Sequence, residues 1–169
     1  GSGVDQGFTD ISGKSDEIQT AINQIKQLGI TVGKTATTYA PDDNVTREEM
    51  AMFISRLLKK ATVGPGGNTE YVLGSSGIKE IKSNDADHNF TDLSSSGLIE
   101  ARNSIVNLWN LGATDAQAFS TYEPLNPMTR KSMATFMANA LAHTNARPAG
   151  LVLQASGYRV VSGTAVTFS

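Results

Sequence analysis

Two stretches of ten residues in this chain follow the same pattern, and this repetition constrains the fold more than any other feature. Residues 41–50 read PDDNVTREEM and residues 124–133 read PLNPMTRKSM. Each stretch places a Pro five residues before a Thr-Arg pair, an apolar residue just before the pair, and a Met three residues after the Arg. A self-similar sequence of this kind indicates a supersecondary unit that has been duplicated.

Matches on both sides extend the repetition over most of the chain. The offset is 82 residues at Phe8 and Phe90 and 83 residues at Thr46 and Thr129, which indicates one inserted residue early in the second copy. Ordered matches at this density are hard to obtain by chance. The matching pairs include Asp10/Asp92, Ile22/Ile105, Ile25/Leu108, Leu28/Leu111, Gly29/Gly112, Tyr39/Tyr122, Pro41/Pro124, Arg47/Arg130, Met50/Met133, Phe53/Phe136 and Leu58/Leu141.

Each copy contains two segments with the apolar spacing of an amphipathic helix. Gly29 follows the last apolar position of the first segment, where a left-handed residue commonly ends a helix. A lone helix pair of this size cannot bury both apolar faces, so the copies are expected to pack on one another. The predicted faces are Ile18, Ala21, Ile22, Ile25 and Leu28; Met50, Phe53, Ile54, Leu57 and Leu58; Ile99, Ile105, Leu108 and Leu111; and Met133, Phe136, Met137 and Leu141.

The predicted fold class is therefore mainly α, with tandem helix-loop-helix repeats at residues 8–61 and 90–145 and a short C-terminal β segment. Residues 1–7, which begin Gly-Ser-Gly, are interpreted as a tag remnant or leader. Residues 62–89 contain a Gly- and Pro-rich cluster and are predicted to be a linker or a small hairpin. Residues 146–169 have short β-like apolar runs, as at the start of a truncated immunoglobulin-like β-sandwich.

Composition excludes several classes of function. The net charge is −2 with a pI near 5.6, and no basic stripe occurs, so nucleic acid is not expected as a partner. No apolar run is long enough to predict a membrane span. The chain has no Cys and two His without zinc-like spacing, so neither a metal nor a cofactor is expected. No catalytic motif is present, and the chain is not expected to be an enzyme.

The repeat unit resembles an S-layer homology domain. The first copy carries FTDI, IKQLGI, YAPDDN and VTREEMAMFI, and the second carries FTDL, VNLWNLGA, YEPLNP and MTRKSMATFM. The resemblance implies non-catalytic helical modules that usually occur in threes. It further implies an exported, extracellular protein held at the cell surface by binding secondary cell-wall polysaccharide, an anionic glycan that is often pyruvylated. On this resemblance, the Arg of the Thr-Arg motif lies at grooves between repeats.

Thr46 and Glu49 form the pattern of a capping box at the start of the second helix. In a capping box the Thr hydroxyl accepts from the third helical amide and the Glu reaches back to the cap amide. Thr129 has Ser132 at the partner position, so only half of its box is expected.

Arg47 is not explained by capping, because the helix dipole slightly disfavours a cation in the first turn. One explanation is an ion pair, with Asp10 or Asp92 as the partner. The other is an acidic ligand held by the guanidinium together with free amides at the helix N-terminus. Arg47 is the first candidate for ligand contact and Arg130 the second.

Two aromatic residues, Tyr39 and Trp109, complete the candidate site. Trp109 is the only Trp and lies beside a core position, so partial burial is favoured over an exposed sugar-stacking platform. Tyr39 and Tyr122 are expected to pack against the second helices with their hydroxyl groups lining a groove. The candidate ligand-binding residues are Arg47, Arg130, Asp10, Asp92, Tyr39 and Trp109.

The sequence thus favours surface anchoring through an anionic cell-wall glycan bound between repeats. The alternative is a protein–protein assembly module of a surface layer, appendage or virion, in which copies of the chain contact each other without a glycan. A third interpretation makes this segment the anchor of an enzyme whose catalytic domain lies beyond Ser169.

Overall fold

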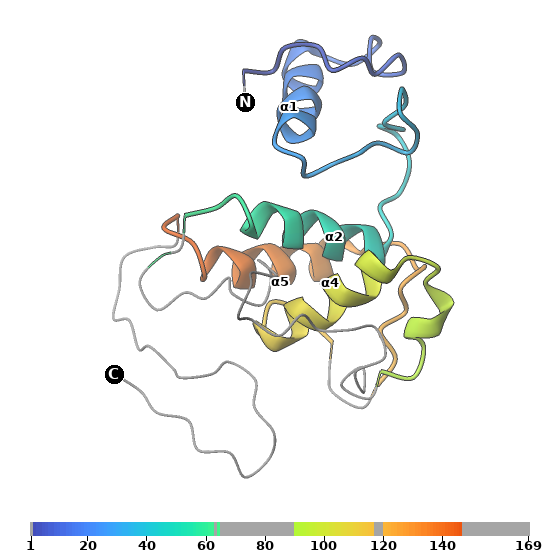
Figure 1. The fold of residues 1–169 in the computed structure, drawn as a ribbon, viewed down its shortest axis with the longest axis vertical. Coiled ribbons are helices and arrows are strands. Elements are labelled where there is room, and N and C mark those ends of the chain that lie inside the picture. Colours follow the sequence, from blue (N-terminus) through green and yellow to red (C-terminus); the bar gives the residue numbers. More distant parts are fainter. Residues whose placement is uncertain (1, 63, 65–89, 117–119, 147–169) are drawn as a thin grey trace. The chain divides into compact units, whose positions relative to one another are not determined.

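The computed structural model describes residues 2–62, 64, 90–116 and 120–146. In this part of the chain the helices are α1 (Asp16–Gln27), α2 (Arg47–Leu58), α4 (Ile99–Asn110) and α5 (Arg130–Leu141), with a short 3-10 helix η2 (Leu93–Ser95) (Figure 1). The prediction of a mainly α fold is confirmed. The predicted hairpin within residues 62–89 and the predicted β segment at 146–169 lie almost entirely outside the described residues.

The chain divides into two compact units, residues 1–44 and residues 45–169. The division falls inside the first predicted repeat, between its two helices. A structural unit is therefore not the same as a sequence repeat. The first unit holds α1, and the second holds α2, α4 and α5.

The first unit is built on α1. Ser15 caps the helix by accepting from the Ile18 amide, and Asp16 and Glu17 place negative charge in the first turn, as the helix dipole favours. The core of the unit is small and consists of Phe8, Ile11 and Ile22, with Tyr39 packed against them.

The second unit is a three-helix arrangement in which α2 packs against both α4 and α5 (Figure 1). Arg56 on α2 pairs with Glu100 on α4 through two hydrogen bonds of 2.7 and 2.9 Å. Phe136 on α5 is fully buried in the same core. The cluster also contains Ala51, Ile54, Leu58, Phe90, Leu93, Ile105, Val106, Leu108, Leu111, Ala113, Ala116, Tyr122 and Ala140.

Several residues predicted on apolar faces are instead exposed. Their side chains keep the helical spacing, but none of the described residues covers that face of the helix. Spacing identifies which residues share a face, whereas burial also requires a second element. The exposed residues and their exposed fractions are Ile18 46%, Leu57 43%, Ile99 64%, Met137 50% and Leu141 43%.

Residues at the same place in the two sequence copies adopt the same backbone conformation. Gly29 and Gly112 follow α1 and α4 with φ of 72° and 69°, so the predicted left-handed helix ends are confirmed. Ala40 and Glu123 also have positive φ, 59° and 60°, although neither is Gly. A non-Gly residue in this region is uncommon, so some local interaction must hold it there.

Candidate functional site

The Thr-Arg motif begins α2, and the predicted capping box is confirmed. The Thr46 hydroxyl accepts from the Glu49 amide at 3.3 Å, and the Glu49 carboxylate accepts from the Thr46 amide at 2.8 Å. At α5 the Thr129 hydroxyl accepts from the Ser132 amide at 3.1 Å, so the half-built box is confirmed as well.

The other amides in the first turn of α2 are also occupied. The Arg47 amide donates to the Asn126 carbonyl and the Glu48 amide donates to the Pro124 carbonyl, both at 2.9 Å. The loop that supplies these carbonyls belongs to the second sequence copy. The prediction of free amides beside Arg47 is therefore wrong, because a neighbouring loop takes the place that an anion would occupy.

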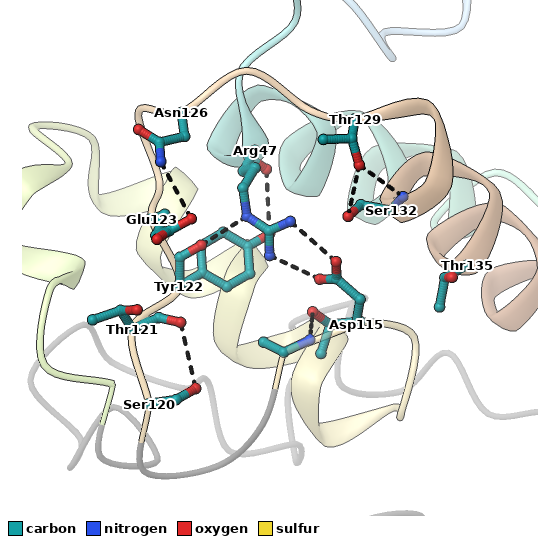
Figure 2. Close-up of polar contacts among 12 residues, drawn as sticks. Arg47, Asp115, Ser120, Thr121, Tyr122, Glu123, Asn126, Thr129, Ser132 and Thr135 are labelled. Atoms are coloured by element: carbon teal, nitrogen blue, oxygen red, sulfur yellow. Dashed lines mark hydrogen bonds and ion pairs between the residues drawn. The ribbon is translucent and has the colours of Figure 1, made fainter.

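The Arg47 guanidinium is fixed from three sides (Figure 2). Its Nε donates to the Tyr122 carbonyl at 2.7 Å, and its two Nη atoms donate to the carboxylate oxygens of Asp115 at 2.8 and 3.2 Å. The guanidinium carbon lies 4.6 Å from the centre of the Tyr122 ring and 5.8 Å from that of Phe136. Arg47 thus makes a bidentate ion pair with stacking, a geometry that Lys could not reproduce.

Asp115 is the ion-pair partner where the sequence had suggested Asp10 or Asp92. Burial alone would raise the pKa of Asp115, but hydrogen bonds and the charge of Arg47 outweigh it, so the pKa lies below its usual value. Burial also raises the pKa of Tyr122, which keeps its hydroxyl protonated. That hydroxyl donates to the Arg47 carbonyl at 3.2 Å, so Tyr122 holds both ends of this residue.

Asp10 and Asp92 have the same structural task in the two units. Asp10 accepts from the Ala40 amide at 2.7 Å and from the amide of the preceding Tyr at 2.9 Å. Asp92 accepts from the Glu123 amide at 2.7 Å and again from the preceding Tyr at 2.9 Å. These carboxylates hold the positive-φ residues in place. Neither carboxylate is among the residues that line the pocket described below.

A pocket of about 720 Å³ lies beside the Arg47–Asp115 pair, within the second unit. Figure 2 shows its polar wall, with Thr129 and Ser132 at the start of α5 near the guanidinium. Six of the eleven lining residues carry a side-chain hydroxyl or amide group. The lining residues are Arg47, Asp115, Ala116, Ser120, Thr121, Tyr122, Glu123, Asn126, Pro127, Thr129 and Ser132.

The remaining candidates lie away from this pocket. Arg130 is exposed at the first position of α5, and its side chain makes no hydrogen bond or ion pair within the part of the chain that the structure describes. Trp109 is half-buried against the core, as predicted. Tyr39 packs on Phe8 in the first unit, with ring centres 5.7 Å apart.

Sequence reasoning missed Asp115 and the hydroxyl groups of the pocket. The position that corresponds to Asp115 in the first copy is Val32, so a search for shared residues passes over it. The signal that could have identified Asp115 was the difference between the two copies at this position, Asp115 against Val32. A carboxylate that appears in only one copy marks a place where the two copies differ in environment.

The described residues contain neither a metal-binding cluster nor a membrane-spanning helix. Among residues 2–62, 64, 90–116 and 120–146, no three His, Asp or Glu side chains gather where they could bind a metal ion. None of the helices in that same part combines the length and apolar character that crossing a bilayer requires.

Residues 7–51 match the family model of the S-layer homology (SLH) domain. The match covers most of the first predicted copy, from the Phe-Thr-Asp segment to the beginning of α2, and ends ten residues before that copy does. Domains of the SLH family are non-catalytic and anchor proteins at the cell wall or surface, so the protein is associated with the cell surface. The second predicted copy and the predicted immunoglobulin-like segment lie outside the match. No curated protein and no solved structure matches the chain.

Proposed function

We propose that residues 8–61 and 90–145 are tandem SLH repeats, and that the chain anchors its protein by binding a cell-wall polysaccharide in the pocket beside Arg47. The observation that carries this proposal is an Arg with unused donors in the wall of a hydroxyl-lined pocket. The family match supports the anchoring role in general terms, and the chemistry of the pocket supports binding at this position.

The second repeat is supported by shared local interactions. Asp10 and Asp92 make the same pair of hydrogen bonds, and the residues they hold have nearly the same φ. After α1 the Ile30 amide donates back to Ile25 at 2.9 Å, and after α4 the corresponding amide does the same at 2.8 Å. Such agreement in polar detail is expected of two copies of one unit.

The pocket offers sugar-like chemistry. A guanidinium has five N–H donors, and Arg47 uses three of them, which leaves two for a ligand. Thr121, Ser132 and Asn126 add side-chain groups suited to sugar hydroxyls. The ring of Tyr122 is covered by Arg47 itself, so recognition here rests on hydrogen bonds rather than on stacking against an aromatic face.

The charges of the pocket restrict how an acidic glycan binds. Asp115 already neutralises Arg47, and Glu123 also lines the pocket. A carboxylate on the glycan, such as a pyruvyl ketal, therefore has to reach the two remaining N–H groups of Arg47. Neutral hydroxyl groups can bind elsewhere along the wall.

Binding of the full chain to purified cell-wall polysaccharide, measured by calorimetry, tests the proposal. Arg47→Ala should weaken binding about tenfold or more, because it removes charge-assisted hydrogen bonds worth more than 1.4 kcal/mol together. Ser132→Glu is a second variant, since it supplies the missing capping-box carboxylate of α5 and places a negative charge in the pocket wall beside Asp115, whose charged form the Ser132 side chain stabilises. It should weaken binding of an acidic glycan. Repulsion from Asp115 opposes the gain from the cap, so thermal unfolding measured alongside shows whether the variant remains folded.

Arg130→Ala is the matched control, because Arg130 is an Arg at the same helix position but outside the pocket. It should leave binding unchanged. Polysaccharide stripped of its acidic groups separates charge recognition from hydroxyl recognition. The proposal fails if the wild-type chain does not bind, or if Ser132→Glu and Arg47→Ala both bind as well as the wild type while remaining folded.

A second candidate function is protein–protein assembly without a glycan. It is favoured by apolar side chains exposed along α5, of which Met137 is 50% and Leu141 43% exposed. A polysaccharide that binds through its hydroxyl groups does not require an exposed apolar face, whereas a protein partner does.

A further inference from the structure

The exposed face of α5 corresponds to the face of α2 that is buried. On α2 that stripe contains Ala51, Ile54, Ser55 and Leu58, with exposed fractions of 0%, 3%, 3% and 1%. The corresponding residues on α5 are Ala134, Met137, Ala138 and Leu141, and all of them are exposed. Both helices thus carry a face suited to packing, and only the face on α2 is covered.

The first unit has the complementary open face on α1. On α4 the buried stripe contains Ala101, Ser104, Leu108 and Leu111, with exposed fractions of 0%, 4%, 0% and 1%. Its counterparts on α1 are Ile18, Ala21, Ile25 and Leu28, of which Ile18 is 46% and Leu28 37% exposed. The α1 stripe is more apolar than the α4 stripe, yet it is less buried.

We propose that α5 of one copy of the chain packs on α1 of a second copy, head to tail, as α2 packs on α4 within one copy. The α5 and α1 helices thus repeat the two faces that meet in the interface between α2 and α4. A stripe of apolar residues left open on each half is the surface expected at a contact between molecules. We assign the partner as a second copy of the chain, because its α1 has the same spacing of apolar residues as α4, the helix against which α2 already packs.

The start of α5 supports the same contact through its backbone. In α2 the first two amides donate to carbonyls of the loop at residues 124–126. In α5 the amides of Arg130 and Lys131 have no partner within the described residues. The corresponding carbonyls, those of Pro41 and Asp43, accept no hydrogen bond from the described residues either. A second copy would bring these four groups together.

The contact is heterologous, because two different surfaces meet. Such a contact continues from copy to copy and gives either a closed ring or an open filament. It uses neither the pocket beside Arg47 nor any glycan. Its failure would leave the proposal of polysaccharide binding untouched.

The first test measures self-association of the full chain by sedimentation equilibrium at concentrations up to about 500 µM, which detects contacts as weak as millimolar. Leu141→Glu places a charge at the C-terminal end of the α5 stripe and should weaken association about tenfold or more. Leu57→Glu is the matched control, since Leu57 and Leu141 are both 43% exposed on their helices and Leu57 lies outside the stripe. The control should associate like the wild type.

A mixing experiment identifies which surfaces meet. Ile18→Glu introduces a charge only on the α1 face, and Leu141→Glu introduces one only on the α5 face. Each variant alone should be monomeric, whereas an equal mixture should form a dimer through the intact α5 of one and the intact α1 of the other. An α5–α5 contact would instead leave Ile18→Glu able to dimerise by itself, and that result would overturn the proposal.

A gain in affinity provides the third test. Arg47 meets Asp115 in the internal contact, and the corresponding contact between copies brings Arg130 to Val32, which is 59% exposed. Val32→Asp should supply the missing carboxylate and strengthen association about threefold to tenfold. Adding Arg130→Ala to Val32→Asp should abolish that gain. A wild-type chain that stays monomeric throughout, or a Val32→Asp variant with unchanged association, overturns the proposal.

Discussion

The segments at residues 8–44 and 90–126 have similar sequences and the same local contacts, but they differ in what covers their helix. Phe8 packs on Tyr39 and Phe90 packs on Tyr122, with ring centres 5.7 and 5.8 Å apart. The second segment nevertheless contributes many residues to a large core, whereas the first has four buried apolar residues, Phe8, Ile11, Ile22 and Ile30. The difference is α2, which packs against α4 and has no counterpart in the first unit.

This comparison separates two sources of order. Capping, turn conformation and hydrogen bonds from a nearby carboxylate act over short distances, and they shape both segments alike. Burial of the outer helix face depends on another helix, and only α4 has one within its unit. Most helical stability in proteins comes from packing of this kind. The first segment is therefore expected to be the less stable of the two.

The largest expected effect comes from truncating the same residue in both segments. Leu111 is 1% exposed and Leu28 is 37% exposed. Leu111→Ala should lower the free energy of unfolding by about 2–5 kcal/mol, because it leaves a cavity in the core. Leu28→Ala should cost less than about 1 kcal/mol, as expected of a partly exposed site. Urea unfolding followed by circular dichroism measures both.

Trp109 fluorescence provides the control for this pair, because the only Trp of the chain lies on α4. Leu28→Ala should leave the transition seen by fluorescence in place. Measurements at low protein concentration keep the proposed contact between copies from covering Leu28. Equal losses of stability in the two variants would show that α1 is as well covered as α4, contrary to the comparison.

The next effect concerns the carboxylates that hold the loops. Asp92→Ala removes an acceptor for two amides and should cost about 1.5–3 kcal/mol, the range for hydrogen bonds to a charged group. It should also weaken polysaccharide binding, since the loop that Asp92 holds lines the pocket. Asp10→Ala should instead act locally and accelerate hydrogen exchange at the Ala40 amide.

Thr91→Ala is a suitable control, because Thr91 is exposed and lies next to Asp92. It should change neither stability nor exchange. If Asp92→Ala left the loop amides as protected as before, the carboxylate would not be what holds the positive-φ residue in place.

The sequence predicted much of the local structure. The capping box at Thr46, the half box at Thr129 and the helix ends at Gly29 and Gly112 are all confirmed. These features depend on residues within a few positions of each other, so their chemistry can be read along the chain. The mainly α class follows from the same periodic patterns.

The partner of Arg47 could not be predicted in the same way. Asp115 is 68 residues away in the sequence and has no counterpart in the first copy. The exposure of Met137 and Leu141 could not be predicted either, because the spacing of apolar residues does not indicate whether another helix covers them. Both errors come from treating the two similar sequence segments as equivalent, although α4 packs against α2 within the second unit and α1 has no such helix within the first.

Acid should affect the second unit more than the first. The folded pKa of Asp115 lies below its usual value despite burial, because Arg47 stabilises the charged form. A depressed pKa contributes stability above the unfolded value, about 3.9, and that contribution is lost as the pH falls through the folded pKa. Asp115→Asn should therefore cost about 1 kcal/mol at neutral pH and flatten the loss of stability below about pH 4.

In the first unit the pKa of Asp10 is also lowered, chiefly by the hydrogen bond from the Tyr39 amide and then by that from Ala40. The same sign applies, so its contribution disappears over the same range of pH. Asp10 is exposed and has no ion pair of the Arg47 kind among the described residues. Trp109 fluorescence against pH follows the second unit, and an unchanged acid transition in Asp115→Asn would contradict the assignment.

The smallest expected effect has the opposite sign. Ala40 and Glu123 have φ of 59° and 60°, where a side chain is strained and Gly is not. Replacing either residue by Gly should relieve this strain but should also increase the freedom of the unfolded chain, for a net gain of about 0.5 kcal/mol. The gain should be similar at both positions, because the local conformation is shared even though the covering of the helices is not. Thermal unfolding of Ala40→Gly and Glu123→Gly measures this. A large gain at one position and none at the other would mean that the surrounding fold, rather than the carboxylate of Asp10 or Asp92, imposes the turn.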